Sequence, residues 1–147
     1  MPTGSGATER IGVKGGEVAT RTRVLLVEDQ ADFRRLMVAL LARQPDLEVV
    51  AQAGSLTEAR RHAETVVFDV VVLDLGLPDG NGVDLISDLR GSNPDAAVLI
   101  LSASLDPASL EKAAEAGANE IMDKLATPIE LIGAIRRLGT GESTDNL

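Results

Sequence analysis

Residues 66–74 have the sequence Val-Val-Phe-Asp-Val-Val-Val-Leu-Asp, an almost continuous apolar run that ends in the carboxylate of Asp74. Such a run is typical of a strand that is buried on both faces in a parallel sheet. Residues 75–82, Leu-Gly-Leu-Pro-Asp-Gly-Asn-Gly, follow at once and have the composition of a loop. Ligands of open α/β sheets bind beyond the carboxyl ends of the strands, so Asp74 has a suitable position for a functional site. Taken alone, Asp74 is still better explained as a cap of the loop or of the next helix.

The composition of the 147 residues restricts the kind of protein. The length suits one domain with a sizeable core, and the absence of cysteine excludes disulfides, thiolate metal sites and cysteine nucleophiles. No signal peptide and no membrane-spanning apolar run are found, which predicts a cytoplasmic location and no membrane contact. The net charge of −9 and the presence of only two aromatic residues, Phe33 and Phe68, argue against a nucleic-acid-binding surface.

Four further strand–helix units are predicted around the 66–74 strand. Residues 1–21 are rich in Gly, Thr and Ser and are predicted to form a disordered tail, and residues 140–147 a second, shorter tail. Residues 22–139 are predicted to form the single folded domain. Its strands are expected at residues 24–27, 47–51, 66–74, 97–101 and 120–123.

A helix is predicted after each of these strands. The first has apolar residues at the spacing of one helical face, namely Phe33, Leu36, Met37 and Leu40. The other helices are indicated by a capping box at Ser55–Glu58, apolar spacing at Val83, Ile86 and Leu89, start and stop signals at Asp106-Pro107 and Gly117, and a first-turn proline at Pro128. Five such units imply a parallel sheet with helices on both faces, because crossover connections are right-handed.

Polar residues end four of the predicted strands: Glu28, Asp29, Asp74, Ser102 and Lys124. The carboxyl ends of parallel strands lie at one edge, so these side chains are expected to converge there. Three converging carboxylates repel one another unless a cation joins them, and ligation by oxygen alone indicates Mg²⁺. An added ammonium and hydroxyl group can hold a phosphoryl group, with Asp74 as the nucleophile that forms an acyl phosphate. Each residue alone is better explained as a turn, a cap or an edge charge.

Four segments carry a family resemblance: Val24-Leu25-Leu26-Val27-Glu28-Asp29, residues 74–82, Leu101-Ser102-Ala103 and residues 117–124. Their order and spacing are those of the receiver domain of bacterial two-component response regulators, which the chain resembles from about residue 21 to residue 138. The segment Lys124-Leu125-Ala126-Thr127-Pro128 resembles the NarL/FixJ-like branch of that family. The resemblance implies an α/β, flavodoxin-like (CheY-like) fold, a five-stranded parallel sheet with strand order 2-1-3-4-5 and helices on both faces.

The resemblance also implies a Mg²⁺ site next to the phosphorylated residue. Asp29 and Asp74 would bind the ion directly, together with the backbone carbonyl of Gly76. Glu28 would act mainly through a metal-bound water. Asp79 also lies in this loop, but its predicted role is turn formation or a place at a helix N-terminus.

The same resemblance gives roles in phosphoryl transfer to the remaining residues. Asp74 would accept the phosphoryl group from a sensor histidine kinase or a phosphotransfer protein. Lys124 would pair with the acyl phosphate, and Ser102 and the amide of Ala103 would donate hydrogen bonds to its oxygens. The domain is therefore expected to be a switch and not an enzyme, and to signal through phosphorylation-dependent contacts with a downstream protein or an output domain.

Two positions depart from the family pattern. Many receivers have Tyr or Phe three residues before the lysine, and the inward movement of that side chain reports phosphorylation to the output face. This chain has Ile121 there, which has no polar tip and cannot reproduce the movement of a tyrosine. Many receivers also follow the lysine with a cis proline, where this chain has Leu125. A cis bond before a residue other than proline costs about 3 kcal/mol, so a trans bond is expected.

Two other functions are compatible with these residues. One is a pseudo-receiver that binds partners without phosphorylation, which Ile121 favours. The other is a phosphatase with an aspartate nucleophile, which Gly76 disfavours because such enzymes place a second Asp two residues after the first. No output domain follows the last predicted helix, so the chain is expected to be either a stand-alone receiver or one cut before a DNA-binding domain, with no nucleic-acid contact by this domain alone. The sequence leaves homodimerisation open.

Overall fold

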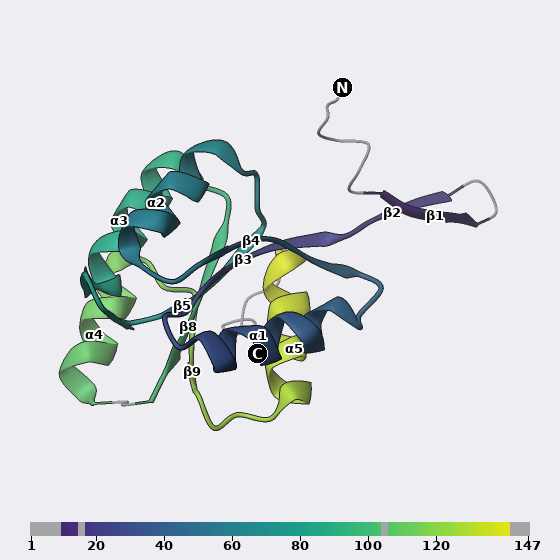
Figure 1. Ribbon diagram of the computed structural model, residues 1–147. Helices are drawn as coiled ribbons and strands as arrows, with labels where there is room; N and C mark the ends of the chain where they lie inside the picture. Colours follow the sequence, from purple (N-terminus) through teal and green to yellow (C-terminus); the bar gives the residue numbers. More distant parts are fainter. Residues whose placement is uncertain (1–9, 15–16, 104–105, 142–147) are drawn as a thin grey trace.

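The computed structural model describes residues 10–14, 17–103 and 106–141. Its centre is a five-stranded parallel sheet with the order β4-β3-β5-β8-β9 (Figure 1). The strands, in chain order, are β3 (Thr22–Val27), β4 (Leu47–Ala53), β5 (Val70–Asp74), β8 (Ala97–Ser102) and β9 (Glu120–Asp123). Numbered by their succession in the sheet-forming part of the chain, these strands have the order 2-1-3-4-5, which confirms the predicted topology.

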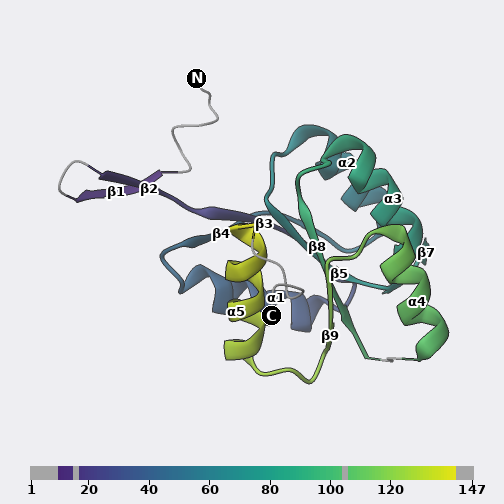
Figure 2. The same cartoon turned by 180° about the vertical axis from the view of Figure 1, so that it is seen from behind.

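Five helices of the described residues cover the two faces of this sheet. They are α1 (Ala31–Ala42), α2 (Leu56–Thr65), α3 (Gly82–Ser92), α4 (Pro107–Ala116) and α5 (Pro128–Gly139). The helices α1 and α5 lie on one face, and α2, α3 and α4 lie on the other (Figure 2). None of the described helices has the length and apolar character needed to cross a bilayer.

Alternate residues of the central strands pack into two separate cores. In β5, Val71 and Leu73 belong to the core under α2, α3 and α4, whereas Val70 and Val72 belong to the core under α1 and α5. All four are at most 1% exposed. Because successive side chains of a strand point to opposite faces, a strand covered on both sides has no polar positions. This burial explains the continuous apolar run that precedes Asp74.

Four of the five described helices have a side-chain cap at the N-terminus. Ser55, Asn81, Asp106 and Thr127 each accept a hydrogen bond from a backbone N–H of the first turn. The predicted capping box at Ser55 is only half formed, since Glu58 accepts a hydrogen bond from the Gly54 N–H, at 2.7 Å, and not from Ser55. The complete capping box is at Thr127 and Glu130, where the sequence pattern predicted a helix start only from the first-turn proline. The stop at Gly117 is confirmed, because its φ of 114° is the left-handed conformation that glycine favours.

Two structural details correct the predicted strand and helix patterns. The strand predicted over residues 66–74 begins only at Val70, and Val67 is 59% exposed. Asp69 directly precedes β5, and its backbone N–H donates to the Arg23 carbonyl at 2.8 Å. Its carboxylate also accepts hydrogen bonds from the Arg23 backbone N–H, at 2.8 Å, and from the Arg23 guanidinium. In α1, Leu36 is 54% exposed, and the helix packs instead through Met37 and, one turn on, Leu41.

Two hairpins occur where irregular structure was predicted. The strands β1 (Arg10–Lys14) and β2 (Glu17–Thr20) pair antiparallel and extend away from the main sheet, within the predicted N-terminal tail (Figure 1). The short strands β6 (Gly76–Leu77) and β7 (Gly80–Asn81) pair within the loop after Asp74. Paired strands satisfy their own backbone groups, which composition does not reveal. Residues 1–9 and 142–147 of the two predicted tails lie outside the described residues, so the domain boundaries at 22 and 139 stay predictions.

Candidate functional site

Three carboxylates meet at the carboxyl edge of the sheet. Glu28 and Asp29 follow β3, and Asp74 is the last residue of the neighbouring strand β5. Each contributes one oxygen to a group in which all three oxygens lie within 4.8 Å of one another. Glu28 is 1% exposed and Asp74 is 8% exposed, whereas Asp29 faces solvent. The structure therefore brings together the carboxylates that the strand pattern predicted to converge.

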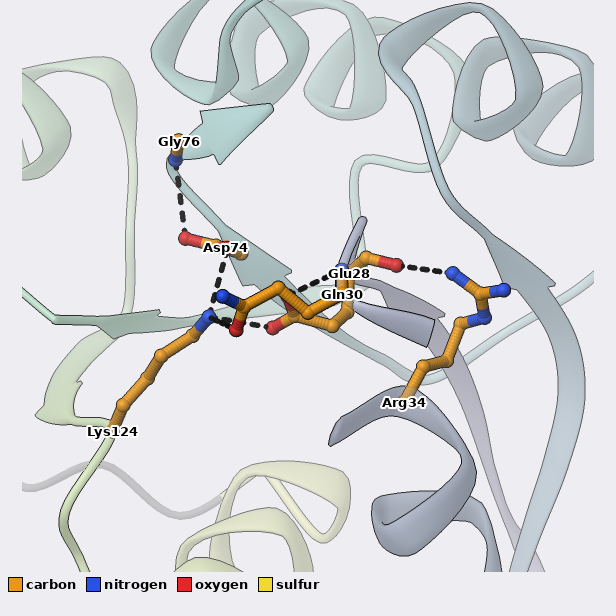
Figure 3. Close-up of polar contacts among 6 residues, drawn as sticks. All are labelled: Glu28, Gln30, Arg34, Asp74, Gly76 and Lys124. Atoms are coloured by element: carbon orange, nitrogen blue, oxygen red, sulfur yellow. Dashed lines mark hydrogen bonds and ion pairs between the residues drawn. The ribbon is translucent and has the colours of Figure 1, made fainter. Parts of the chain in front are cut away.

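The ammonium group of Lys124 lies between the carboxylates of Glu28 and Asp74 (Figure 3). Lys124 directly follows β9, and its Nζ is 2.9 Å from Oε1 of Glu28 and 3.0 Å from Oδ2 of Asp74. The Nζ also lies 5.0 Å from the centre of the Phe33 ring, which is within the range of a cation–π contact. When all are ionised, three carboxylates and one ammonium leave two negative charges at the site. A divalent cation would neutralise them.

The loop after β5 fixes the orientation of the Asp74 carboxylate. The N–H of Gly76 donates a hydrogen bond to Oδ1 of Asp74 at 3.1 Å, while Lys124 binds the other oxygen (Figure 3). Gly80, the first residue of β7, has a φ of 148°, a conformation that favours glycine. A side chain at Gly82 would lie 3.1 Å from the backbone oxygen of Asp74, so glycine lets the start of α3 approach the site closely.

The hydroxyl and amide predicted to bind phosphoryl oxygens lie on the neighbouring strand. Ser102 ends β8 and is buried, and the exposed Ala103 follows it. Asp74 is paired in register with Leu101 of β8, so Ser102 is one residue beyond the strand partner of Asp74. The backbone N–H of Lys124 donates to the carbonyl of Ser102 at 3.0 Å, which ties the end of β8 to the lysine.

Burial and charge act against each other within this site. Burial raises the pKa of the Glu28 carboxyl, because desolvation disfavours its charged form, although the hydrogen bonds from Lys124 and from the Gln30 N–H lower it. Burial alone would lower the pKa of Lys124, but its hydrogen bonds with Glu28 and Asp74 outweigh this effect and raise the pKa. Lys124 is therefore held as a cation by the two carboxylates.

Asp79 has both of the roles predicted for it, because it lies in the turn between β6 and β7 and its carboxylate lies at the N-terminus of a helix. It accepts hydrogen bonds from the N–H groups of Leu56, at 2.8 Å, and of Thr57, at 3.1 Å, which begin α2. The Thr57 hydroxyl donates to it as well, at 2.9 Å. The helix concerned lies 23 residues earlier in the chain, so sequence spacing could not identify it. Asp79 thus fastens the loop of Asp74 to the neighbouring helix.

Replacement of Asp79 by alanine should lower the urea midpoint of unfolding at neutral pH, because the first turn of α2 loses its acceptor. Hydrogen bonds, first of all from Leu56, lower the pKa of Asp79 below its ordinary 3.8 in the folded state. The stability it contributes is therefore present above that value and is lost as the pH falls through the lower folded-state pKa. Urea titrations of both proteins should show a difference that shrinks in acid, and a difference independent of pH would contradict this role.

Two further residues of the site were not predicted from the sequence. Gln30 accepts a hydrogen bond from Nζ of Lys124 at 3.3 Å, and the Arg34 guanidinium donates to the backbone carbonyl of Glu28 at 2.6 Å (Figure 3). Both lie at the start of α1, directly after the acid pair. Glutamine is not a preferred N-cap residue, and its place before the predicted helix was the only feature of the sequence that could have pointed to Gln30.

Comparison with known proteins identifies the family of this site. A sequence profile of the response regulator receiver domain matches residues 24–136, which include all the residues gathered here. The chain belongs to the response regulator receiver domain family. It is thus a receiver domain of the two-component type, as the resemblance implied, and its flavodoxin-like fold is the one that this family shares.

Individual relatives place this receiver in the NarL/LuxR group. The DNA-binding transcriptional activator DevR/DosR of Mycobacterium tuberculosis is 40% identical over 121 residues, which are 82% of this chain and 56% of the relative. The chain therefore spans about half the length of that regulator. A LuxR-family two-component response regulator from Aurantimonas sp. has a structure with 33% identity and a TM-score of 0.78, matching 84% of this chain and 89% of that one.

A third relative contains a phosphorylated aspartic acid. This response regulator from Burkholderia pseudomallei, solved with a calcium ion and citrate, is 25% identical, with a TM-score of 0.72 over 82% of this chain and 69% of that one.

The two positions that depart from the family pattern are both among the described residues. Three residues before the lysine, Ile121 is half-buried and packs against the core under α2, α3 and α4. No cis peptide bond occurs among the described residues, so Leu125 follows Lys124 in trans, as expected.

Proposed function

We propose that this receiver accepts one phosphoryl group on Asp74 from a sensor histidine kinase or a phosphotransfer protein, in a reaction that depends on Mg²⁺. The phosphorylated domain then signals through contacts with a downstream protein or an output domain. One observation carries the proposal: the Asp74 carboxylate lies 3.0 Å from the Lys124 ammonium and within a cluster of three carboxylates. A carboxylate flanked by an ammonium and a cation site is suited to hold a phosphoryl group.

The acidic cluster has the donor set of a magnesium site. Its ligands are oxygens only, which suits a hard cation that keeps several waters. Asp29, Asp74 and the backbone carbonyl of Gly76 would hold the ion, and Glu28 would act through a bound water. When bound, Mg²⁺ supplies neutralisation of the charge on the carboxylates and on the phosphoryl oxygens. The two negative charges left by Lys124 support a divalent ion over a monovalent one.

In the proposed transfer a carboxylate oxygen of Asp74 attacks the phosphorus of a phosphohistidine. The new O–P bond replaces the P–N bond, and the imidazole leaves with the electron pair and takes up a proton. Lys124 places its positive charge beside the equatorial oxygens, while the Ser102 hydroxyl and the Ala103 amide donate hydrogen bonds to them. The product is an acyl phosphate on Asp74, and the domain itself performs no further catalysis.

A small phosphodonor tests this function without knowledge of the kinase. Acetyl phosphate with Mg²⁺ is expected to add one phosphoryl group, observed by intact mass and mapped to the peptide that contains Asp74. The same mixture with the Mg²⁺ chelated should leave the protein unmodified. No increase in mass, or an equal increase without Mg²⁺, would count against the proposal.

A second candidate, a partner-binding domain that needs no phosphorylation, is favoured by one observation. Ile121 is half-buried against the core, and it lacks the polar tip of a tyrosine side chain that moves between an inward and an outward position. Under this alternative, an Asp74→Asn protein would bind its partner with unchanged affinity whether or not acetyl phosphate is present. An affinity that rises on phosphorylation of the wild-type protein alone supports the switch.

A further inference from the structure

Gln30 contacts both the acidic and the basic part of the site. Its backbone N–H donates to Oε2 of Glu28 at 3.0 Å, and its side-chain oxygen accepts a hydrogen bond from Nζ of Lys124 at 3.3 Å. Glu28 lies two residues before it, whereas Lys124 lies 94 residues after it. Figure 3 shows the glutamine side chain extended over the site between these two partners. Gln30 therefore joins the end of β3 to the end of β9.

Gln30 occupies a position whose side chain ordinarily caps the N-terminus of a helix. It is the N-cap of α1, with extended backbone angles of −76° and 106°, yet its side chain accepts no hydrogen bond from the helix. Short polar side chains are strongly preferred at this place, and the other four described helices have them. A local preference that is ignored in this way is typical of a functional position. The glutamine side chain contacts Lys124 in place of the helix.

Gln30 also differs in charge from the other acceptors of the lysine. An ammonium has three N–H donors, and among the described residues three acceptors surround that of Lys124, namely Glu28, Asp74 and Gln30. The two carboxylates belong to the acidic cluster and would be shared with a bound cation. The amide of Gln30 is neutral, so a bound cation attracts it less strongly than it attracts the carboxylates of Glu28 and Asp74. This acceptor can hold the ammonium in place while the carboxylates are shared.

We propose that Gln30 is a positioning residue of the phosphorylation site, which keeps the Lys124 ammonium beside Asp74. The inference rests on the proposed function of Asp74, since it concerns the charge that the incoming phosphoryl group meets. Gln30 does not touch the phosphoryl group in this proposal. It acts through Lys124 alone, and its effect is on the rate of transfer and not on the capacity for it.

The contact itself can be tested in the cation-free protein by substitution of Gln30 with methionine. Methionine has nearly the length of glutamine but no acceptor oxygen. Loss of one of three acceptors should speed the exchange of the Lys124 ammonium protons with water about fivefold, which the ¹H–¹⁵N NMR signal of that group reports. Unchanged exchange in Gln30→Met would overturn the proposal, whatever the protein does with a phosphodonor.

The consequence for phosphorylation is tested with the same variant at saturating Mg²⁺. The maximal rate with acetyl phosphate should fall about fivefold, with an unchanged half-saturating concentration of acetyl phosphate. Gln30→Glu keeps an acceptor oxygen at the same reach and should recover the slow ammonium exchange in the cation-free protein. Its carboxylate would be shared with bound Mg²⁺, so its rate at saturating Mg²⁺ should stay below that of the wild-type protein. If the ammonium exchange of cation-free Gln30→Glu is as fast as that of Gln30→Met, the acceptor oxygen is not responsible and the proposal is wrong.

Gln30→Ser separates positioning from stability. Serine is a preferred N-cap, so this variant should raise the urea midpoint of unfolding while losing the reach to Lys124. Its phosphorylation rate should fall as far as that of Gln30→Met, and a rate that instead follows stability would contradict a positioning role. A wild-type protein that acquires no phosphoryl group would refute the proposed function, whereas the ammonium exchange still decides whether Gln30 holds the lysine.

Discussion

Asp74→Asn is expected to lower the rate of phosphorylation by acetyl phosphate more than about 1000-fold, because an amide cannot replace the carboxylate as nucleophile. The fold should survive the change. An asparagine oxygen can still accept from the Gly76 N–H, which lies 3.1 Å from Asp74 Oδ1, and Lys124 keeps its contact with Glu28 at 2.9 Å. The free energy of unfolding should therefore change by no more than about 1 kcal/mol. Intact mass and urea titration measure the two effects separately.

Asp79→Asn is the matched control for this variant. It makes the same chemical change five residues along the same loop, but Asp79 contacts the start of α2 and takes no part in the acidic cluster. Asparagine is also a good helix cap, so α2 keeps an acceptor. This variant should be phosphorylated at the rate of the wild-type protein. If Asp74→Asn were phosphorylated as fast as Asp79→Asn, the phosphoryl group would be located on another residue, and the proposed function would be wrong.

The convergence of the acidic and basic residues could be predicted because it follows from topology. Once parallel strands end at Asp29, Asp74 and Lys124, the carboxyl edge of the sheet must gather them, whatever the details of packing. The handedness of the crossovers was equally constrained, whereas the strand order was implied by the family resemblance. The chemistry expected of the site therefore required no knowledge of side-chain conformations.

Features that depend on individual contacts could not be predicted in the same way. The apolar pattern includes Val67 and Leu36, yet both are more than half exposed, because hydrophobicity indicates a tendency and not a partner. Asp79 caps α2 from a distant loop, and Gln30 contacts a lysine 94 residues away. Such pairs are settled only when the tertiary structure brings two surfaces together. They are also the contacts that tune the site.

The partnership of Lys124 with the buried carboxylates leads to the largest expected effect on stability. Lys124→Met removes the ammonium but keeps the length of the side chain, leaving Glu28, which is 1% exposed, and Asp74 without their cation. Breaking a buried ion pair by removal of one partner costs about 3 kcal/mol. We expect a loss of that size in the free energy of unfolding, from urea titration at neutral pH without divalent ions.

A double-mutant cycle shows whether this loss comes from the charge. Glu28→Gln removes one of the two uncompensated carboxylates, so the protein with both substitutions should recover most of the stability lost in Lys124→Met. Saturating Mg²⁺ should also stabilise Lys124→Met more than it stabilises the wild-type protein, because the cation then meets no competing ammonium. Additive effects in the cycle would mean that the loss comes from packing of the lysine stem and not from its charge.

The pH dependence of Lys124→Met gives an independent test with a definite sign. Burial already raises the pKa of Glu28 above its ordinary 4.5, and the loss of the ammonium removes an influence that lowers it. The folded state then holds the Glu28 proton more tightly than the unfolded state does. This contribution to stability is fully present below pH 4.5 and is lost as the pH rises through the folded-state pKa. The stability difference between Lys124→Met and wild type should therefore be small in acid and grow toward neutral pH, and a constant difference would show that Glu28 does not depend on Lys124.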